Sequence, residues 1–170
     1  MTQASPTQTS LRALTKADLP WLLALNDACV PAVNALDATA MEALLCEAVW
    51  TGAVEQAGLP LAVLIAFAPG ACYRSTNYAW FDAQEESFAY IDRVMVAQEG
   101  RGQGLGRRLY EALAAWASEA GYPRLCCEVN EVPPNPQSIA FHESLGFKAL
   151  VSRINPADGK QVRMFERRLG

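Results

Sequence analysis

Glycine occupies positions 100, 102, 104 and 106 of the chain, and Arg101 lies among them. Residues 96–109 begin like a strand and end like an amphipathic helix. Glycines permit backbone dihedral angles that a Cβ would forbid and let a ligand approach the backbone closely. N–H groups at a helix N-terminus attract anions, and an arginine adds a cation. The segment is therefore predicted to bind a pyrophosphate, and the alternative is a flexible glycine-rich turn.

Two common phosphate-binding loops do not fit this segment. The dinucleotide-binding pattern would require glycine at position 105 or 107, where leucine and arginine stand. The P-loop requires Gly-Lys-Ser/Thr, which the chain does not contain. What remains is Arg101-x-x-Gly104-x-Gly106 between a strand and a helix. This pattern resembles the acyl-CoA-binding motif of the Gcn5-related N-acetyltransferases.

A second stretch, about thirty residues further on, strengthens the resemblance. It reads Asn135-x-x-Ser138-x-x-Phe141-His142-x-x-x-Gly146-Phe147 and is similar to a second signature of the same family, in which tyrosine usually stands where this chain has histidine. Two motifs in the family's order, on the expected elements, are far more specific than either alone.

The resemblance implies a site for acetyl-CoA as co-substrate, without a metal. Backbone groups of two residues on the strand before the loop would hold the pantetheine arm and the acyl carbonyl, since an exposed strand edge can pair with an amide-containing chain. N–H groups of the loop would hold the pyrophosphate, and the asparagine of the second signature would contact the pantetheine. The implied residues are Val94, Val96, Arg101, Gly102, Gln103, Gly104, Leu105, Gly106 and Asn135.

Acyl transfer to an amine requires a proton donor for the departing thiolate and a base for the amine. His142 occupies the position of the family's tyrosine donor and is the predicted acid; the alternative is a partly buried structural histidine. Glu128 resembles the base of some protein N-terminal acetyltransferases and is the predicted base, with Asp92 as its competitor. Two alternatives stay open. Each carboxylate could instead form a structural ion pair, for example with Arg93 or Arg124, or a water could act as the base.

Residues 69–86 form a long segment between two predicted strands. Such a segment is usually functional or disordered, and its four aromatic side chains argue against disorder. The segment is either a lid over the bound acceptor or a structural segment packed against the rest of the domain. The predicted acceptor-binding residues are Tyr73, Tyr78, Trp80 and Phe81.

Hydrophobic periodicity predicts the order β-α-α-β-β-β-α-β-α-β-β in one domain, residues 1–170. The resemblance implies an α/β (α+β) fold whose central sheet is mixed and mostly antiparallel. It would have about seven strands, four flanking helices and a splay between the fourth and fifth strands. Predicted strands cover residues 11–13, 53–57, 61–67, 88–96, 124–130, 147–153 and 162–168, and predicted helices cover 15–28, 38–49, 105–121 and 136–145.

Composition and charge restrict the function classes. A formal net charge of −4 argues against general nucleic-acid binding, and the longest apolar run is too short to span a bilayer. The N-terminal residues lack the features of a signal peptide. Five cysteines without a C-x-x-C pair argue against a disulfide framework or a zinc site. Cys126 and Cys127 are predicted to be core residues. A cytoplasmic protein is expected, with a homodimer as one option for its assembly.

Two classes of function follow from these features. The first is an acetyl-CoA-dependent N-acetyltransferase that acylates a primary amine of a small molecule or peptide by direct transfer. The second is a non-catalytic acyl-CoA-binding module, in which the absence of the family's tyrosine indicates that catalytic activity has been lost.

Overall fold

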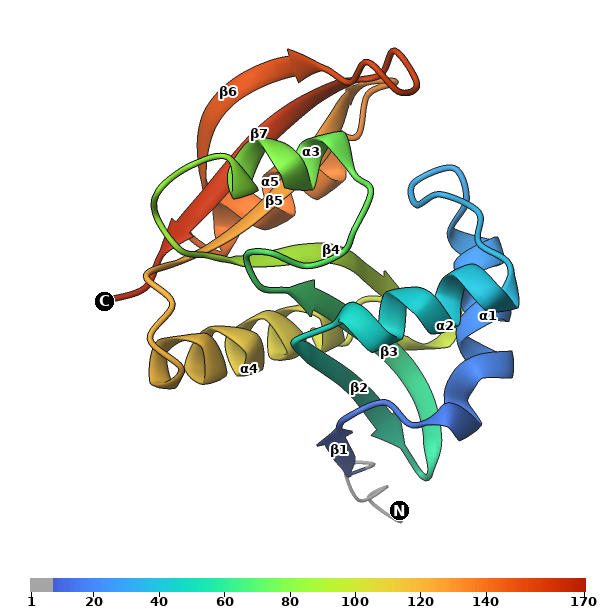
Figure 1. Ribbon diagram of the computed structural model, residues 1–170. Coiled ribbons are helices and arrows are strands. Elements are labelled where there is room, and N and C mark those ends of the chain that lie inside the picture. Colours follow the sequence, from blue (N-terminus) through green and yellow to red (C-terminus); the bar gives the residue numbers. More distant parts are fainter. Residues whose placement is uncertain (1–7) are drawn as a thin grey trace. The chain divides into compact units, whose positions relative to one another are not determined.

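The computed structural model describes residues 8–170 (Figure 1). Most of the polar N-terminal stretch, residues 1–7, lies outside the described residues. The described chain forms a seven-stranded sheet in the order β1-β2-β3-β4-β5-β7-β6. The strands are β1 Thr9–Arg12, β2 Trp50–Gln56, β3 Leu59–Phe67, β4 Ala89–Val96, β5 Arg124–Val132, β6 Lys148–Ile154 and β7 Gln161–Arg168.

Helices separate the strands in nearly the predicted order. The α-helices are α1 Leu19–Cys29, α2 Ala38–Glu47, α3 Thr76–Asp82, α4 Leu105–Glu119 and α5 Pro136–Ser144, with short 3₁₀ turns η1 Lys16–Asp18 and η2 Gln98–Gly100. The predicted mixed α/β fold is confirmed, and α3 is a fifth helix that the prediction did not contain.

The chain divides into two compact units. The first consists of Met1–Cys46, Trp50–Ile65 and Arg93–Leu113, and the second of Glu47–Val49, Ala66–Asp92 and Ala114–Gly170. Strands β3 and β4 are each divided between the units, after Ile65 and after Asp92.

In the first unit, β1 pairs antiparallel with β2. Strands β2 and β3 are joined by Ala57 and Gly58, whose φ angles are 51° and 78°. Positive φ at both central residues matches the type I′ turn, whose twist suits two adjoining antiparallel strands. The strands predicted at residues 53–57 and 61–67 leave residues 58–60 between them, whereas in the structure β2 ends at Gln56 and β3 already begins at Leu59.

In the second unit, β7 lies between β5 and β6 and pairs antiparallel with both; β6 and β7 form the C-terminal hairpin drawn in orange and red (Figure 1). Strands β4 and β5 pair in parallel, through Ala89↔Leu125 and Tyr90↔Cys126. This ladder lies at the beginning of both strands.

Helix α3 lies within the segment that was predicted to be a loop. The Ser75 hydroxyl caps it by accepting the Tyr78 N–H at 3.2 Å. Tyr78 and Phe81 are 2% and 0% exposed, so the helix is fixed by burial of its apolar side chains. Helices this short are marginal without tertiary packing, which explains why local sequence patterns did not predict it.

Candidate active site

The glycine loop before α4 has the geometry of an anion site. Gly102 and Gly104 both have φ of +73°, and a Cβ added at either position would meet nothing within 4 Å. The Gly104 carbonyl accepts the Arg108 N–H at 3.0 Å, so Gly104 occupies the N-cap position directly before α4. The first N–H groups of a helix have no partner inside it. The loop therefore presents open space at the positive end of the helix dipole.

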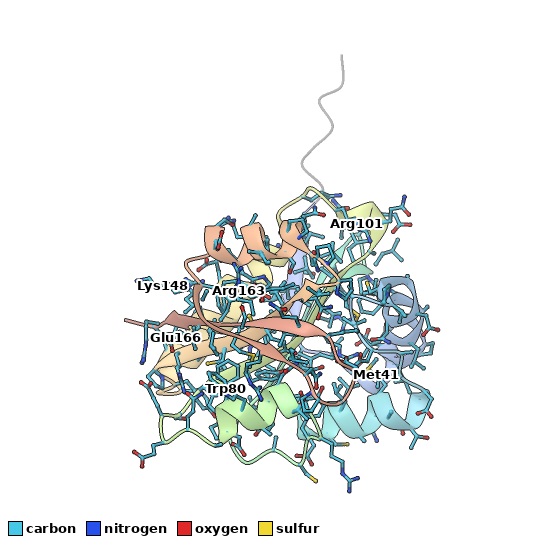
Figure 2. The ribbon with its side chains drawn as sticks, turned by 90° about the horizontal axis from the view of Figure 1, so that it is seen from above. Met41, Trp80, Arg101, Lys148, Arg163 and Glu166 are labelled. Carbon is cyan, nitrogen blue, oxygen red and sulfur yellow. The ribbon has the colours of Figure 1, made fainter. Side chains whose placement is uncertain are left out.

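Gly100 has a different role from the glycines that follow it. It is buried, and a Cβ there would lie 2.8 Å from Leu105 Cδ1 and 3.2 Å from Leu61 Cβ. The glycine at this position allows close packing beneath the loop. Arg101, labelled in Figure 2, is exposed at the end of η2.

The first unit brings together most of the residues implied for acetyl-CoA. Val94 and Val96 on β4 are half-buried and flank the buried Met95. Gln103 donates from its side-chain amide to the Glu99 carbonyl at 2.7 Å, Leu105 is buried, and Gly106 lies in the first turn of α4. Asn135 belongs to the second unit, where its side-chain oxygen caps α5 by accepting the Ser138 N–H at 3.2 Å.

Glu128, on β5 in the second unit, lies at the centre of a polar cluster. The Tyr90 hydroxyl donates to its carboxylate at 2.6 Å, and the Asn77 side chain acts to lower the pKa of Glu128. Burial, together with the nearby charge of Asp92, raises the pKa of Glu128 to about 7 despite these two effects. A carboxylate that titrates near neutrality is suited to accept a proton at physiological pH.

Asp92, the competing carboxylate, accepts a hydrogen bond from the Tyr73 hydroxyl. Tyr90 is fully buried, and burial raises its pKa well above the ordinary value, with the charges of Glu128 and Asp92 adding to the effect. Arg124, considered as an ion-pair partner, instead contacts Glu166 at 3.1 Å and Glu86 at 3.7 Å.

The raised pKa of Glu128 predicts a specific pH dependence of stability. Between pH 4.5, the ordinary pKa of a glutamate side chain, and about 7, the native state holds more protons at this position than the unfolded state. The contribution of Glu128 to stability therefore falls as pH rises through this window. Relative to Glu128→Gln, the wild type should lose on the order of 1–3 kcal/mol between pH 5 and 8. Urea unfolding of both proteins at several pH values measures this loss. A difference in unfolding free energy between the two proteins that does not change with pH would contradict the assigned pKa.

His142, the predicted acid, is buried on α5, at 4% exposure. Its Nδ1 lies 2.7 Å from the Ser138 carbonyl oxygen. A carbonyl only accepts, so Nδ1 carries the hydrogen and Nε2 is the nitrogen that would exchange a proton. The ring stacks on Phe165 at 6.0 Å and meets Phe147 edge-on at 5.4 Å. Burial lowers the pKa of His142, and the Ser138 hydrogen bond opposes this effect.

The aromatic residues predicted to bind the acceptor lie in different surroundings. Tyr78 and Phe81 are buried core residues of the second unit. Trp80, labelled in Figure 2, is half-buried, with the Arg153 guanidinium 5.6 Å from its ring. Tyr73 is half-buried and packs 4.5 Å from Phe67, centroid to centroid. The segment is packed, and Tyr73 is the one of the four that hydrogen-bonds to a candidate catalytic carboxylate.

Cys126 and Cys127 are buried, as predicted for core residues. Burial raises the pKa of Cys126 to about 12 and that of Cys127 well above its usual value. A thiol must ionise to act as a nucleophile, so these residues are poor candidates for an acyl carrier.

Sequence reasoning did not find Tyr90 and Asn77 as neighbours of Glu128. They lie 38 and 51 positions before it, and neither belongs to a motif quoted for the family. The available signal was the cluster of polar and aromatic residues in the segment that contains Asn77. Nothing in that segment specified which side chain would turn toward β5.

The mixed sheet and the glycine-rich loop before α4 agree with the fold that the two sequence motifs imply. Residues 46–147 match the model of the acetyltransferase (GNAT) family. The chain belongs to this family. No curated protein matched the sequence significantly.

Solved structures of low sequence identity share the fold. Ard1 from Thermoplasma volcanium is 16% identical, with a TM-score of 0.77 over 95% of this chain and 98% of that one. The ribosomal-protein-alanine N-acetyltransferase of Brucella melitensis is 23% identical, with a TM-score of 0.72 over 94% and 99%. A candidate acetyltransferase, yncA of Salmonella typhimurium, was solved with its cofactor acetyl-CoA; it is 19% identical, with a TM-score of 0.71 over 96% and 95%.

Within residues 8–170, no helix has the length and apolar character needed to cross a membrane. In the same part of the chain, no group of three or more His, Cys, Asp or Glu side chains is arranged to hold a metal ion.

Proposed function

We propose that this protein is an acetyl-CoA-dependent N-acetyltransferase that acylates a primary amine of a small molecule or a peptide by direct transfer. The observation that carries the proposal is Glu128, whose pKa is raised to about 7 beside Tyr90. A module that only binds acyl-CoA has no need of such a base. The glycine loop, with open space at Gly102 and Gly104, supports acetyl-CoA as the donor.

In the proposed reaction Glu128 takes a proton from the acceptor's ammonium group. The neutral nitrogen attacks the thioester carbonyl and a C–N bond forms. As the C–S bond breaks, the positively charged nitrogen gives up its second proton to leave the amide, so two protons leave the nitrogen and one is taken up by the departing thiolate. The loop N–H groups and Arg101 would hold the pyrophosphate, which fixes the donor without taking part in the chemistry.

His142 remains the proposed donor of the thiolate's proton. Its lowered pKa makes the imidazolium a stronger acid but leaves less of it protonated at neutral pH. The contribution should therefore lie at the lower end of the range for general acids, about 100-fold.

His142→Phe should consequently lower kcat about 100-fold and leave the Kd for acetyl-CoA nearly unchanged. The apolar ring should be tolerated because Phe147 and Phe165 surround the position. His142→Tyr restores the family's usual donor and is the matched control, expected to retain more activity than Phe. Steady-state kinetics and calorimetry on the three proteins decide the question. Full activity in the Phe variant would eliminate His142 as the acid.

CoA release, assayed with acetyl-CoA and a panel of primary amines, tests the proposed function itself. A transferase releases CoA faster with at least one amine than without any. A non-catalytic module would bind acetyl-CoA in calorimetry but show only background release with every amine.

A cytoplasmic location is part of the proposal. Cys46 and Cys72 are exposed free thiols, and such thiols persist in reducing compartments.

A further inference from the structure

A charged side chain lies on the buried face of β4. Arg93 is 5% exposed, and Met95, two positions further along and on the same face, is 1% exposed. Taking a guanidinium out of water is costly, and a well-packed apolar residue at such a position often gives equal or greater stability. Packing alone therefore does not explain an arginine at this position, and the explanation must lie in what its side chain contacts.

Arg93 is hydrogen-bonded to a second buried polar side chain, Asn26 of α1. The Nη1 of Arg93 donates to the Oδ1 of Asn26 at 2.6 Å, and Asn26 is 0% exposed. The Nδ2 of Asn26 donates in turn to the Asn34 carbonyl at 3.0 Å. One carboxamide thus joins β4 to α1 and to the segment between α1 and α2. All three residues belong to the first unit.

The position of Arg93 along β4 connects this contact with the donor. Arg93 directly precedes Val94, which with Val96 carries the backbone groups implied for the pantetheine arm. The pairing of β4 with β5 ends at Tyr90, three residues before Arg93. A strand edge that pairs with a ligand cannot at the same time pair with another strand, so other contacts must fix its position. The hydrogen bond to Asn26 fixes β4 at the residue before Val94.

We propose that Arg93 and Asn26 are positioning residues for the acyl-CoA donor. Their hydrogen bond holds β4 so that the backbone groups of Val94 and Val96 meet the pantetheine amides, and small displacements of such groups are costly for binding and reaction. This inference rests on the proposed function for the identity of the donor. It has a selective consequence: the contact matters for ligands that pair with β4 and not for ligands that reach only the glycine loop.

Acetyl-CoA and ADP are the probes, because ADP carries a pyrophosphate but no pantetheine. In the double variant Arg93→Met/Asn26→Leu both partners become apolar, a change that is often neutral for stability. Calorimetry on the full chain should show the Kd for acetyl-CoA raised about tenfold or more and the Kd for ADP changed less than about twofold. Circular dichroism confirms the fold. Equal changes in both Kd values, or no change in either, would overturn the proposal.

Asn26→Asp is the matched control. It keeps an oxygen that accepts from Arg93 but has no N–H for the Asn34 carbonyl. Its Kd for acetyl-CoA should stay within a few-fold of the wild type, because the contact with β4 persists. A loss as large as in the double variant would assign the effect to the link with Asn34 and contradict the role of β4. If the double variant does not fold, Asn26→Ala is measured with the same probes, and the same selective loss is expected.

The outcomes also distinguish the positioning role from the proposed function. A selective loss of acetyl-CoA affinity in the double variant, without CoA release by the wild type from any amine, would support the positioning role and remove the transferase assignment. CoA release by the wild type, together with an unchanged ratio of the two Kd values in the double variant, would do the opposite.

Discussion

Gly104→Asp should abolish measurable acetyl-CoA binding, whereas Gly104→Asn should retain most of it. Both side chains are among the few that tolerate the φ of +73° at this position, and neither meets an atom within 4 Å at its Cβ. Asp and Asn are also favourable residues at the beginning of a helix. The variants therefore share shape and stability and differ mainly in one negative charge, which would lie at the proposed pyrophosphate site.

The expected increase in Kd for Gly104→Asp is about 100-fold or more, because two like charges a few ångströms apart repel by several kcal/mol at the effective dielectric near a protein surface. Calorimetry with acetyl-CoA measures the increase, and circular dichroism confirms that both variants fold. Equal affinities of the Asp and Asn variants would remove the assignment of the loop as the pyrophosphate site.

Glu128→Gln should lower kcat/KM by about 10²–10⁴-fold while the Kd for acetyl-CoA stays the same. Glutamine preserves the size of the side chain and can still accept the Tyr90 hydrogen bond, but it cannot take up a proton. For the wild type, kcat/KM should rise with pH through about 7, where Glu128 loses its proton.

Asp92→Asn is the matched control for this substitution, because Asp92 is the other carboxylate of the cluster and accepts from Tyr73. Removal of its charge should lower the pKa of Glu128, since Asp92 raises it, and so move the rise in kcat/KM to lower pH. Pre-steady-state and pH-dependent kinetics on the three proteins are the measurement. A larger loss in Asp92→Asn than in Glu128→Gln would assign the base to Asp92 instead.

The sequence predicted the elements that carry strong local signals. The spacing of Arg101, Gly104 and Gly106 placed the loop between a strand and a helix, and the structure has β4 and α4 there. The helix predicted at residues 136–145 is α5, and the side chain of Asn135, the first residue of the second signature, caps it. These features depend on residues a few positions apart, so they can be read from the sequence directly.

The surroundings of the candidate base could not be predicted in the same way. Helix α3 is only seven residues long and is fixed by burial of Tyr78 and Phe81, which local propensity does not report. Tyr73 donates to Asp92, and Asn77 acts on the pKa of Glu128, only because this segment folds back in the second unit. Contacts between residues so far apart in sequence arise from tertiary packing, and no motif encodes them.

The central claim, direct transfer of an acetyl group to a primary amine, is tested most directly by mass spectrometry after incubation with acetyl-CoA. The wild type is incubated with and without the amine that gives the fastest CoA release. We predict one N-acetylated amine for each CoA released, unmodified protein throughout, and a rate reduced about 100-fold or more in Glu128→Gln. Release of CoA without an acetylated amine, or an acetylated protein formed as an intermediate, would contradict the account.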